Sequence, residues 1–394
     1  MGVDRRKFIK GAGAAVLAAG LPQCSKSRKR RAGVEGDAEL ELDADAEVAC
    51  EAEAEAEAEA EGSEPGPQCE FEPGPVATGT GLVYDERYKL HDPTVVKSWH
   101  PEKPERCDAI LDALRTEGLE ARMRATTPRM ATEAELLLCH TQEYIDRVKE
   151  DVATGEDYAD NDGDTCINEH SWDVALLAAG GGFVAVDAVM RGEVRNAFCL
   201  IRPPGHHAKE DHSMGYCILN NAALAARYAQ DVYCVERVLI VDWDVHHGNG
   251  TQRMFYTDGS VFYFSTHREN YYPGTGSAQD TGILDGEGTI LNCPYPAGAG
   301  RQEIVVESFQ DRLVPAMDGY QPDLVVISAG FDSHAGDTHG FELTDADFAE
   351  LTAIVMGIAR EYGRERVVSV LEGGYALDAL AGAAAAHVEA LIEG

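Results

Sequence analysis

Between residues 80 and 394, short apolar runs rich in β-branched residues alternate with longer segments of helical pattern. This alternation limits the fold more than any other feature, because it predicts a parallel sheet with helices on both faces. In such sheets, ligands bind outside the carboxyl ends of the strands. The expected strands are residues 82–84, 136–139, 197–201, 238–241, 261–264, 324–328 and 367–371. The expected helices include residues 173–190, 222–230, 303–317 and 345–362.

Five of the expected strands are followed by side chains that can carry out chemistry. In chain order the strands lead into RPPGHHA, DWDVHHGNGT, STHRENYYPGTG, AGFDSH and EGGY. A single histidine pair is more often structural than functional. The carboxyl ends of parallel strands meet at one edge of a sheet, so the five motifs together predict a shared site.

The loop after residues 238–241 carries candidate metal ligands. Asp244 and His246 are two residues apart on an extended segment, so their side chains can point the same way, and Asp332 follows another strand. Two carboxylates and one imidazole leave a position open for water and substrate. This set suits Zn²⁺, and Fe²⁺ or Co²⁺ with less selectivity. The ten cysteines contain no CxxC pair, which excludes a zinc ribbon or finger.

His206 and His207 can supply the base that activates a metal-bound water and the acid that a departing amine needs. Asp242 and Asn249, in the loop with the metal ligands, are placed to fix the two imidazoles. A carboxylate partner keeps its histidine basic and an amide partner does so less, which separates the two roles. Tyr375 follows two glycines and is the expected oxyanion stabiliser. The set fits hydrolysis of an amide carbonyl.

The motifs RPPGHHA, DWDVHHGNGT, YYPGTG, AGFDSH and LEGGY resemble those of the zinc-dependent histone deacetylase family, in the family's order. VYDERYKLHDP and HPEKPER resemble the start of its class II branch and that branch's bacterial relatives. The resemblance covers about residues 80–390. It implies an α/β protein with the three-layer arginase/deacetylase fold, whose central, mainly parallel sheet has about eight strands.

The resemblance also implies roles for single residues. It places Zn²⁺ on Asp244, His246 and Asp332. It makes His207 the main general base, His206 with Asp242 an electrostatic partner or acid, and Tyr375 the transition-state tyrosine. Asn249, where some relatives have Asp, agrees with the class II branch. The family's structural K⁺ would lie at Asp242, Asp244, His246, Ser265 and nearby carbonyls.

The acyl-lysine tunnel of the family maps to Gly215, Tyr216 and Tyr272, with His339 near its entrance. Relatives usually have Phe at the two tyrosine positions, so this tunnel is expected to be more polar. Relatives that prefer acetylated polyamines carry a Glu seven residues after the last metal ligand, where this chain has His339. The expected substrates are acylated lysine side chains or related amines, with acetylpolyamines as an alternative.

Two other functions are weighed against hydrolysis of acyl amines. A non-catalytic module that holds acyl groups would use the same tunnel, but the full set of ligands, histidine pair and tyrosine argues against it. An arginase-like ureohydrolase needs a two-metal cluster with a DxHxD pattern, and DWDVHHGNG lacks the further aspartate.

The N-terminal segment, residues 1–34, carries nine Lys or Arg and one Asp. Arg5 and Arg6, in DRRKFIK before the apolar residues 11–21, predict a twin-arginine export signal, with a basic cytosolic N-terminus as the alternative. The predicted location is therefore the periplasm or cell envelope, or the cytoplasm if there is no signal. Cys24 lies where a lipid-modified cysteine is expected, although Leu-Pro-Gln before it fits poorly, so membrane attachment there stays open.

Residues 35–79 are expected to form an acidic, low-complexity linker ahead of a catalytic domain at 80–394. The repeat EAEAEAEAEAE places like charges four residues apart, which favours an extended or weakly helical spacer. Cys50 and Cys69 flank it and either pair in an oxidising compartment or stay free. A net charge of −36 argues against a nucleic-acid partner gripped along its phosphates. No run of 18 uninterrupted apolar residues predicts a membrane span.

Overall fold

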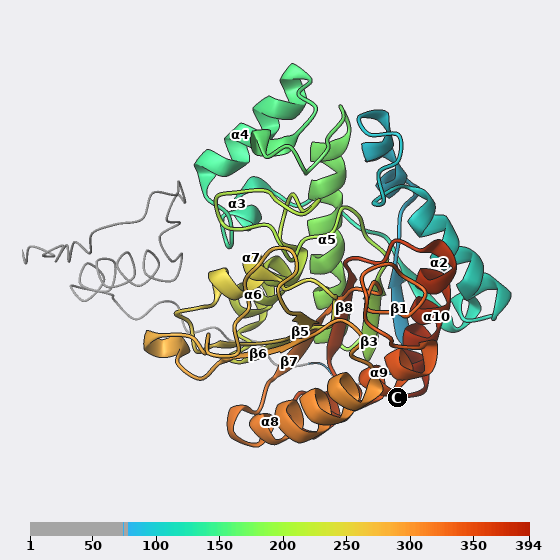
Figure 1. Ribbon diagram of the computed structural model, residues 1–394, viewed down its shortest axis with the longest axis vertical. Helices are drawn as coiled ribbons and strands as arrows, with labels where there is room; N and C mark the ends of the chain where they lie inside the picture. Colours follow the sequence, from blue (N-terminus) through green and yellow to red (C-terminus); the bar gives the residue numbers. More distant parts are fainter. Residues whose placement is uncertain (1–73, 75–77) are drawn as a thin grey trace, which may run out of the picture. The chain divides into compact units, whose positions relative to one another are not determined.

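The computed structural model describes residue 74 and residues 78–394 (Figure 1). The predicted signal with Arg5 and Arg6, the lipidation at Cys24 and the pairing of Cys50 with Cys69 lie outside the described residues. Most of the predicted linker lies outside them too, so these features stay predictions.

One sheet of eight parallel strands forms the centre of the described region. From one edge to the other the strands are β2 (Met123–Thr126), β1 (Thr80–Val83), β3 (Asn196–Cys199), β8 (Val367–Leu371), β7 (Leu324–Ala329), β4 (Val238–Asp242), β5 (Val261–Arg268) and β6 (Ile290–Tyr295). The four strands β8, β7, β4 and β3 are buried along their whole length, as expected for a sheet covered on both faces. The prediction of a parallel α/β sheet is confirmed.

Helices cover both faces of this sheet (Figure 1). They are α2 (Glu105–Thr116), α3 (Glu133–Leu136), α4 (Gln142–Thr154), α5 (Ser171–Met190), α6 (Asn221–Tyr233), α7 (Asn249–Met254), the π-helix η6 (Gln302–Leu313), α8 (Val314–Tyr320), α9 (Asp345–Glu361) and α10 (Leu377–Glu393). On one side α10 packs against both α2 and α9, and on the other α5 packs against α6. Short 3₁₀ turns lie at Glu86–Leu90, Pro93–Val95, Glu120–Arg122, Ala159–Asn161 and Leu284–Gly286.

Helix α5 is the one helix in the described part of the chain that is long and apolar enough to cross a membrane. It is mostly buried among other elements, and two of its glycines show how closely they approach. A Cβ on Gly180 would lie 1.9 Å from the main-chain oxygen of Arg129, and one on Gly181 would lie 2.7 Å from the hydroxyl of Tyr88. The apolar composition of α5 is therefore accounted for by its place in the core.

The prediction of a strand at residues 136–139 is wrong. Thr132 and Glu135 form a reciprocal capping box that starts α3, and the apolar run then continues as a turn. Strands β2 and β6 were missed because they lie at the two edges of the sheet, where burial on both faces is not required. The predicted helix 303–317 is helical but divided, because Pro315 cannot donate a main-chain hydrogen bond and stands in the first turn of α8.

A fully buried histidine on α10 packs behind the strand ends. Its Nδ1 lies 2.7 Å from Thr352 Oγ1 and its Nε2 lies 2.8 Å from Ser369 Oγ. The ring of this residue, His387, packs edge-on against Trp243, with 5.5 Å between centroids. Burial lowers the pKa of His387 to about 3.

This histidine makes the fold sensitive to acid. The unfolded chain binds a proton at His387 near pH 6.5, whereas the folded chain binds it only near pH 3, so its contribution to stability is lost as pH falls below 6.5. Between pH 7 and pH 5 the expected loss is about 2 kcal/mol. Urea unfolding of wild type and His387→Gln at both pH values measures it, because the stability difference between them should change by that amount. An unchanged difference contradicts the prediction.

Candidate active site

The five strands whose ends carry the sequence motifs are neighbours in the sheet, in the order β3, β8, β7, β4, β5. Their carboxyl ends therefore open onto one region, as the sequence predicted. The loop after β4 lies between the loops that follow β7 and β5, and the His206–His207 loop after β3 adjoins the Tyr375 loop after β8.

Asp244, His246 and Asp332 form a compact group of possible metal ligands. One ligand atom from each lies within 4.8 Å of the others. His246 Nδ1 is 3.0 Å from Asp244 Oδ1 and 3.2 Å from Asp332 Oδ2. Both carboxylates are fully buried, and the imidazole is 13% exposed.

The hydrogen bonds of this group leave one carboxylate oxygen for a cation. Asp332 Oδ1 accepts from the main-chain N–H of Val245 at 2.9 Å, and Asp244 Oδ2 accepts from that of Gly373 at 2.8 Å. Asp332 Oδ2 is buried without a hydrogen-bond partner of acceptable geometry. An orphaned buried carboxylate oxygen is unfavourable unless a positive charge meets it. The donor set and this oxygen fit a bound Zn²⁺.

His206 and His207 lie beside the metal ligands, 3% exposed, with 4.0 Å between their ring centroids. Nδ1 of His206 is 3.0 Å from Asp242 Oδ2, and Nδ1 of His207 is 2.8 Å from Asn249 Oδ1. The structure therefore pairs each histidine with the partner proposed from the sequence. The Asp242 carboxylate also accepts a hydrogen bond from the hydroxyl of Tyr263 at 3.0 Å.

The two partners divide the histidines electrostatically. Burial opposes a charge on His206, but Asp242 and Asp244 outweigh it and raise the pKa of His206 to about 10. Burial, followed by the neighbouring positive charges of His206 and His246, holds the pKa of His207 well below its usual range. His206 is thus the charged member of the pair and His207 the neutral one.

Tyr375 lies at the end of β8 with its main chain held from two sides. Its N–H donates to Asp337 Oδ2 at 2.7 Å, and the carbonyl of Gly374 accepts from Arg106 Nε at 2.7 Å. The guanidinium of Arg106 lies over the Tyr375 ring, 5.1 Å from its centroid. Desolvation, and then the negative charge of Asp332, raises the pKa of Tyr375 well above its usual range, so its hydroxyl keeps the proton it can donate.

The predicted tunnel residues border this group. The Tyr272 ring stands perpendicular to His207 at 5.1 Å, and the Tyr216 ring stands perpendicular to Tyr375 at 6.0 Å. Gly215 lies against the imidazole, since a Cβ there would be 2.2 Å from His207 Cδ2. Tyr216 has a φ of 68°, a left-handed conformation that tertiary contacts must hold for a residue with a side chain.

His339, the predicted entrance residue, and Ser265, a predicted K⁺ ligand, also lie near the site. The His339 ring is 5.0 Å from His246, and its Nδ1 is 2.5 Å from Asp337 Oδ1. Ser265 stands opposite Asp242 in the register of β4 and β5, but its Oγ lies 2.9 Å from His267 Nδ1. The structure thus places the two residues side by side, and the K⁺ site stays a prediction.

Several residues with strong contacts to the site were not assigned by sequence reasoning. Glu102 is fully buried, with Arg202 Nη2 2.6 Å from its Oε2 and Arg106 Nη1 3.3 Å from its Oε1. Arg202 precedes the histidine loop, whereas Arg106 holds the Tyr375 loop. The spacing of Glu and Arg in HPEKPER, four residues apart, was an available signal for a helical pair, but not for these distant contacts. Glu372, within LEGGY, was quoted without a role.

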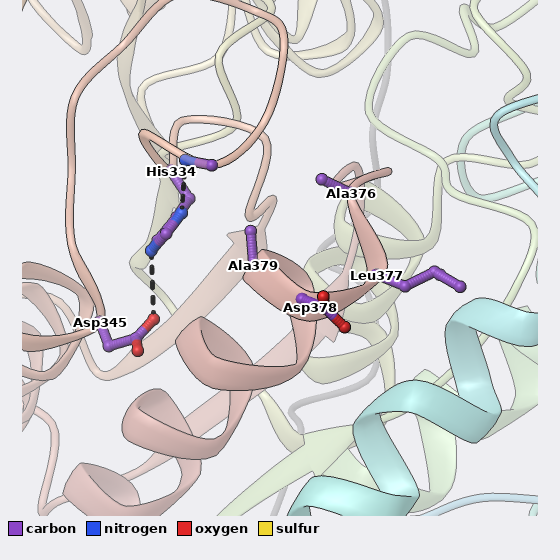
Figure 2. Close-up of a pocket in the computed structure, with 7 residues that line it drawn as sticks. His334, Asp345, Ala376, Leu377, Asp378 and Ala379 are labelled. Carbon is purple, nitrogen blue, oxygen red and sulfur yellow. Dashed lines mark hydrogen bonds and ion pairs between the residues drawn. The ribbon is translucent and has the colours of Figure 1, made fainter.

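A hollow of about 500 Å³ lies between the loop after Asp332 and the start of α10 (Figure 2). His334 and Asp345 line it and form an ion pair, with Nε2 3.2 Å from Oδ1. Ala376, directly after Tyr375, lines it too. None of the predicted ligands or tunnel residues does, so this hollow is separate from the predicted tunnel.

Comparison with known proteins gives consistent similarities. The model of the histone deacetylase domain matches residues 100–391. Histone deacetylase 15 of Arabidopsis thaliana is 40% identical over 321 residues, which cover 80% of this chain and 57% of that protein. Polyamine deacetylase HDAC10 of Danio rerio is 37% identical over 332 residues, which cover 80% of this chain and 48% of that protein.

Two further similarities come from smaller proteins. A probable deacetylase of Archaeoglobus fulgidus is 38% identical over 302 residues, which cover 76% of this chain and 82% of that protein. The crystal structure of the HDA15 HD domain superimposes with a TM-score of 0.76 and 39% identity, over 80% of this chain and 90% of that one. The chain thus spans about half the length of the plant and fish relatives and most of the archaeal one.

Proposed function

The chain belongs to the histone deacetylase family, and on this premise we propose that it is a Zn²⁺-dependent amidohydrolase that removes acetyl or other acyl groups from lysine side chains or related amines. Its parallel sheet and the solved relative are those of the three-layer arginase/deacetylase fold. The observation that carries the proposal is the buried Asp332 oxygen without a hydrogen-bond partner, in a group of three ligands beside two differently partnered histidines.

Asp244, His246 and Asp332 would hold the metal, which when bound polarises the amide carbonyl and acidifies a water molecule. The chain then has to hold and move the protons. Asn249 Oδ1 can only accept, so Nδ1 of His207 carries the hydrogen and Nε2 presents the lone pair. A neutral imidazole with a free Nε2 can take a proton from the attacking water, which makes His207 the proposed general base.

His206 and Tyr375 are proposed to stabilise the negative charge that develops on the substrate. Asp242 and Asp244 keep His206 protonated, so it brings a fixed positive charge next to the base. Tyr375 keeps its phenolic proton and can donate it as a hydrogen bond. Such prearranged donors act most strongly where water is excluded. The proton that the departing amine needs is supplied by the histidine pair.

Acyl-lysine is the first proposed substrate class, with acetylpolyamines as the second. Tyr272 and Tyr216, which flank His207 and Tyr375, suit a narrow acylated side chain. The predicted entrance residue is His339 and not an acidic one. The polyamine class is favoured by the relatives from Danio rerio and Homo sapiens that are named polyamine deacetylases, at 37% and 39% identity.

The deciding experiment measures metal content and acyl release on the purified full chain. Acetyl-lysine peptides, longer acyl-lysines, acetylpolyamines and small aromatic amides are compared. About one zinc per chain and acetate release that a chelator abolishes and zinc restores are the expected results. Bound zinc without turnover on any substrate would instead favour the module that only holds acyl groups.

Replacing Tyr375 with phenylalanine is expected to slow turnover by about 10²–10³-fold, because one donor to the developing oxyanion is lost. Zinc content should not change, since Tyr375 is not among the three proposed ligands. Steady-state kinetics and metal analysis of the same preparation measure both effects. Tyr362→Phe is the matched control, because that hydroxyl bonds the distant Asp318. Loss of zinc in Tyr375→Phe would show that its role has been misassigned.

Export to the periplasm or cell envelope is proposed from Arg5 and Arg6. A fusion of residues 1–34 to a reporter, with both arginines present or changed to lysine, tests it. Export that depends on the arginines supports the proposal. A reporter that stays in the cytoplasm in both forms places the enzyme there.

A further inference from the structure

Glu372, at the end of β8, is a buried acid to which the proposed mechanism gives no part. It is fully buried, and its two carboxylate oxygens accept three hydrogen bonds. Oε2 accepts from the main-chain N–H groups of Gly205 at 2.7 Å and His206 at 3.1 Å, and Oε1 accepts from Ser328 Oγ at 3.0 Å. None of these donors is charged. A buried acid without a direct cationic partner is unfavourable, so its presence requires a reason.

The histidine loop has few other main-chain attachments at this point. Pro203 and Pro204 lack N–H groups, so Gly205 and His206 carry the first main-chain donors after Arg202. Both donate to Glu372. The start of the loop is therefore attached to β8 through this single side chain.

The sheet order explains why one side chain can reach these partners. Strand β8 lies between β3 and β7, so its last side chain lies beside the histidine loop after β3 and beside Ser328 of β7. The main chain that follows Glu372 continues the connection. The N–H of Gly373 donates to Asp244 Oδ2 at 2.8 Å, and Tyr375 comes two residues later.

We propose that Glu372 is a positioning residue, which holds the His206–His207 turn at a set distance from the metal ligands and Tyr375. This inference rests on the proposed function for its effect on rate, but the hold itself is a property of the fold. Reacting groups must be placed to within about 0.5 Å, and a displacement of about 1 Å lowers rates by about 10²-fold.

The hold depends on an acceptor oxygen and not on a negative charge. Burial raises the pKa of Glu372 to about 7, and a carboxyl group protonated toward Ser328 still accepts both N–H bonds. An amide can do the same. In Glu372→Gln the carbonyl oxygen can accept from Gly205 and His206, and the NH₂ group can donate to the hydroxyl of Ser328.

The test compares Glu372→Ala with Glu372→Gln in the full chain loaded with zinc, using an acetyl-lysine peptide. Glu372→Ala is expected to lower kcat by about 10–10²-fold with KM within about threefold and zinc content unchanged. Glu372→Gln should return kcat to within about threefold of wild type. Glu389→Ala, an exposed acid on α10, is the control and should behave as wild type.

Hydrogen exchange at the amides of Gly205 and His206 reads the hold without any turnover. Both amides should exchange faster in Glu372→Ala and at the wild-type rate in Glu372→Gln. If wild type hydrolyses no acyl amine, the proposed function fails while exchange still decides the role of Glu372. A folded Glu372→Ala with wild-type kcat and exchange overturns the inference, as does Glu372→Gln that is as slow as the alanine variant.

Ser328→Ala keeps the test open if Glu372→Ala does not fold. It removes only the hydroxyl that anchors Oε1. A smaller loss of kcat, with faster exchange of the Gly205 and His206 amides, is the expected result. Unchanged exchange of both amides in this variant overturns the inference.

Discussion

Replacing Asp332 with asparagine is expected to abolish metal binding and to reduce acyl release to the uncatalysed background. The amide oxygen can keep the hydrogen bond from Val245, which places the NH₂ group where the unpartnered Oδ2 now lies. An NH₂ group cannot serve as a metal ligand, so one of the three protein ligands is lost. Zinc per chain after dialysis, measured beside turnover, should fall from about one to near zero.

Thermal unfolding gives a second measurement of this substitution that does not depend on activity. Added zinc should raise the Tm of wild type, because a metal that binds only the folded state stabilises it. Asp332→Asn should show no such increase. Asp345→Asn is the matched control, since this half-exposed acid pairs with His334 at the hollow outside the ligand group. Normal zinc content in Asp332→Asn would contradict the proposed ligand set.

Replacing His207 with alanine is expected to lower turnover by about 10²–10⁴-fold, the range for loss of a general base. Zinc content should stay at the wild-type level, because His207 bonds Asn249 and is not among the three proposed ligands. The measurement is kcat on an acetyl-lysine peptide together with metal analysis. His170→Ala, which removes a half-exposed imidazole at the start of α5, should leave both unchanged. A near-normal rate with intact zinc would refute the role of His207.

Local pattern was sufficient for much of the fold and of the site. Asp244 and His246 could be paired from their spacing alone, because alternate residues of an extended segment share a face. The same reasoning failed at residues 136–139, where an apolar run suggested a strand. There the capping box of Thr132 and Glu135 starts a helix, and a short apolar run does not distinguish the two.

The supporting residues could not be predicted in the same way. Arg106 reaches the carbonyl of Gly374, 268 residues later in the chain, and Glu372 reaches the N–H of Gly205, 167 residues earlier. Such contacts have no local periodicity. They follow from which loops the sheet brings together, and the two acidic residues Glu102 and Glu372 show their purpose only through their partners.

The sequence by itself determined the elements and their ends: apolar runs had to be buried as strands, and each motif had to follow a strand into the loop beyond it. Only the tertiary structure decided that β8 lies between β3 and β7, and β7 beside β4. That order brings Asp332 to Asp244 and Tyr375 to the histidine pair. The physical reason is that burial and alternation act along the chain, whereas strand order is set by how the helical crossovers pack across the whole sheet.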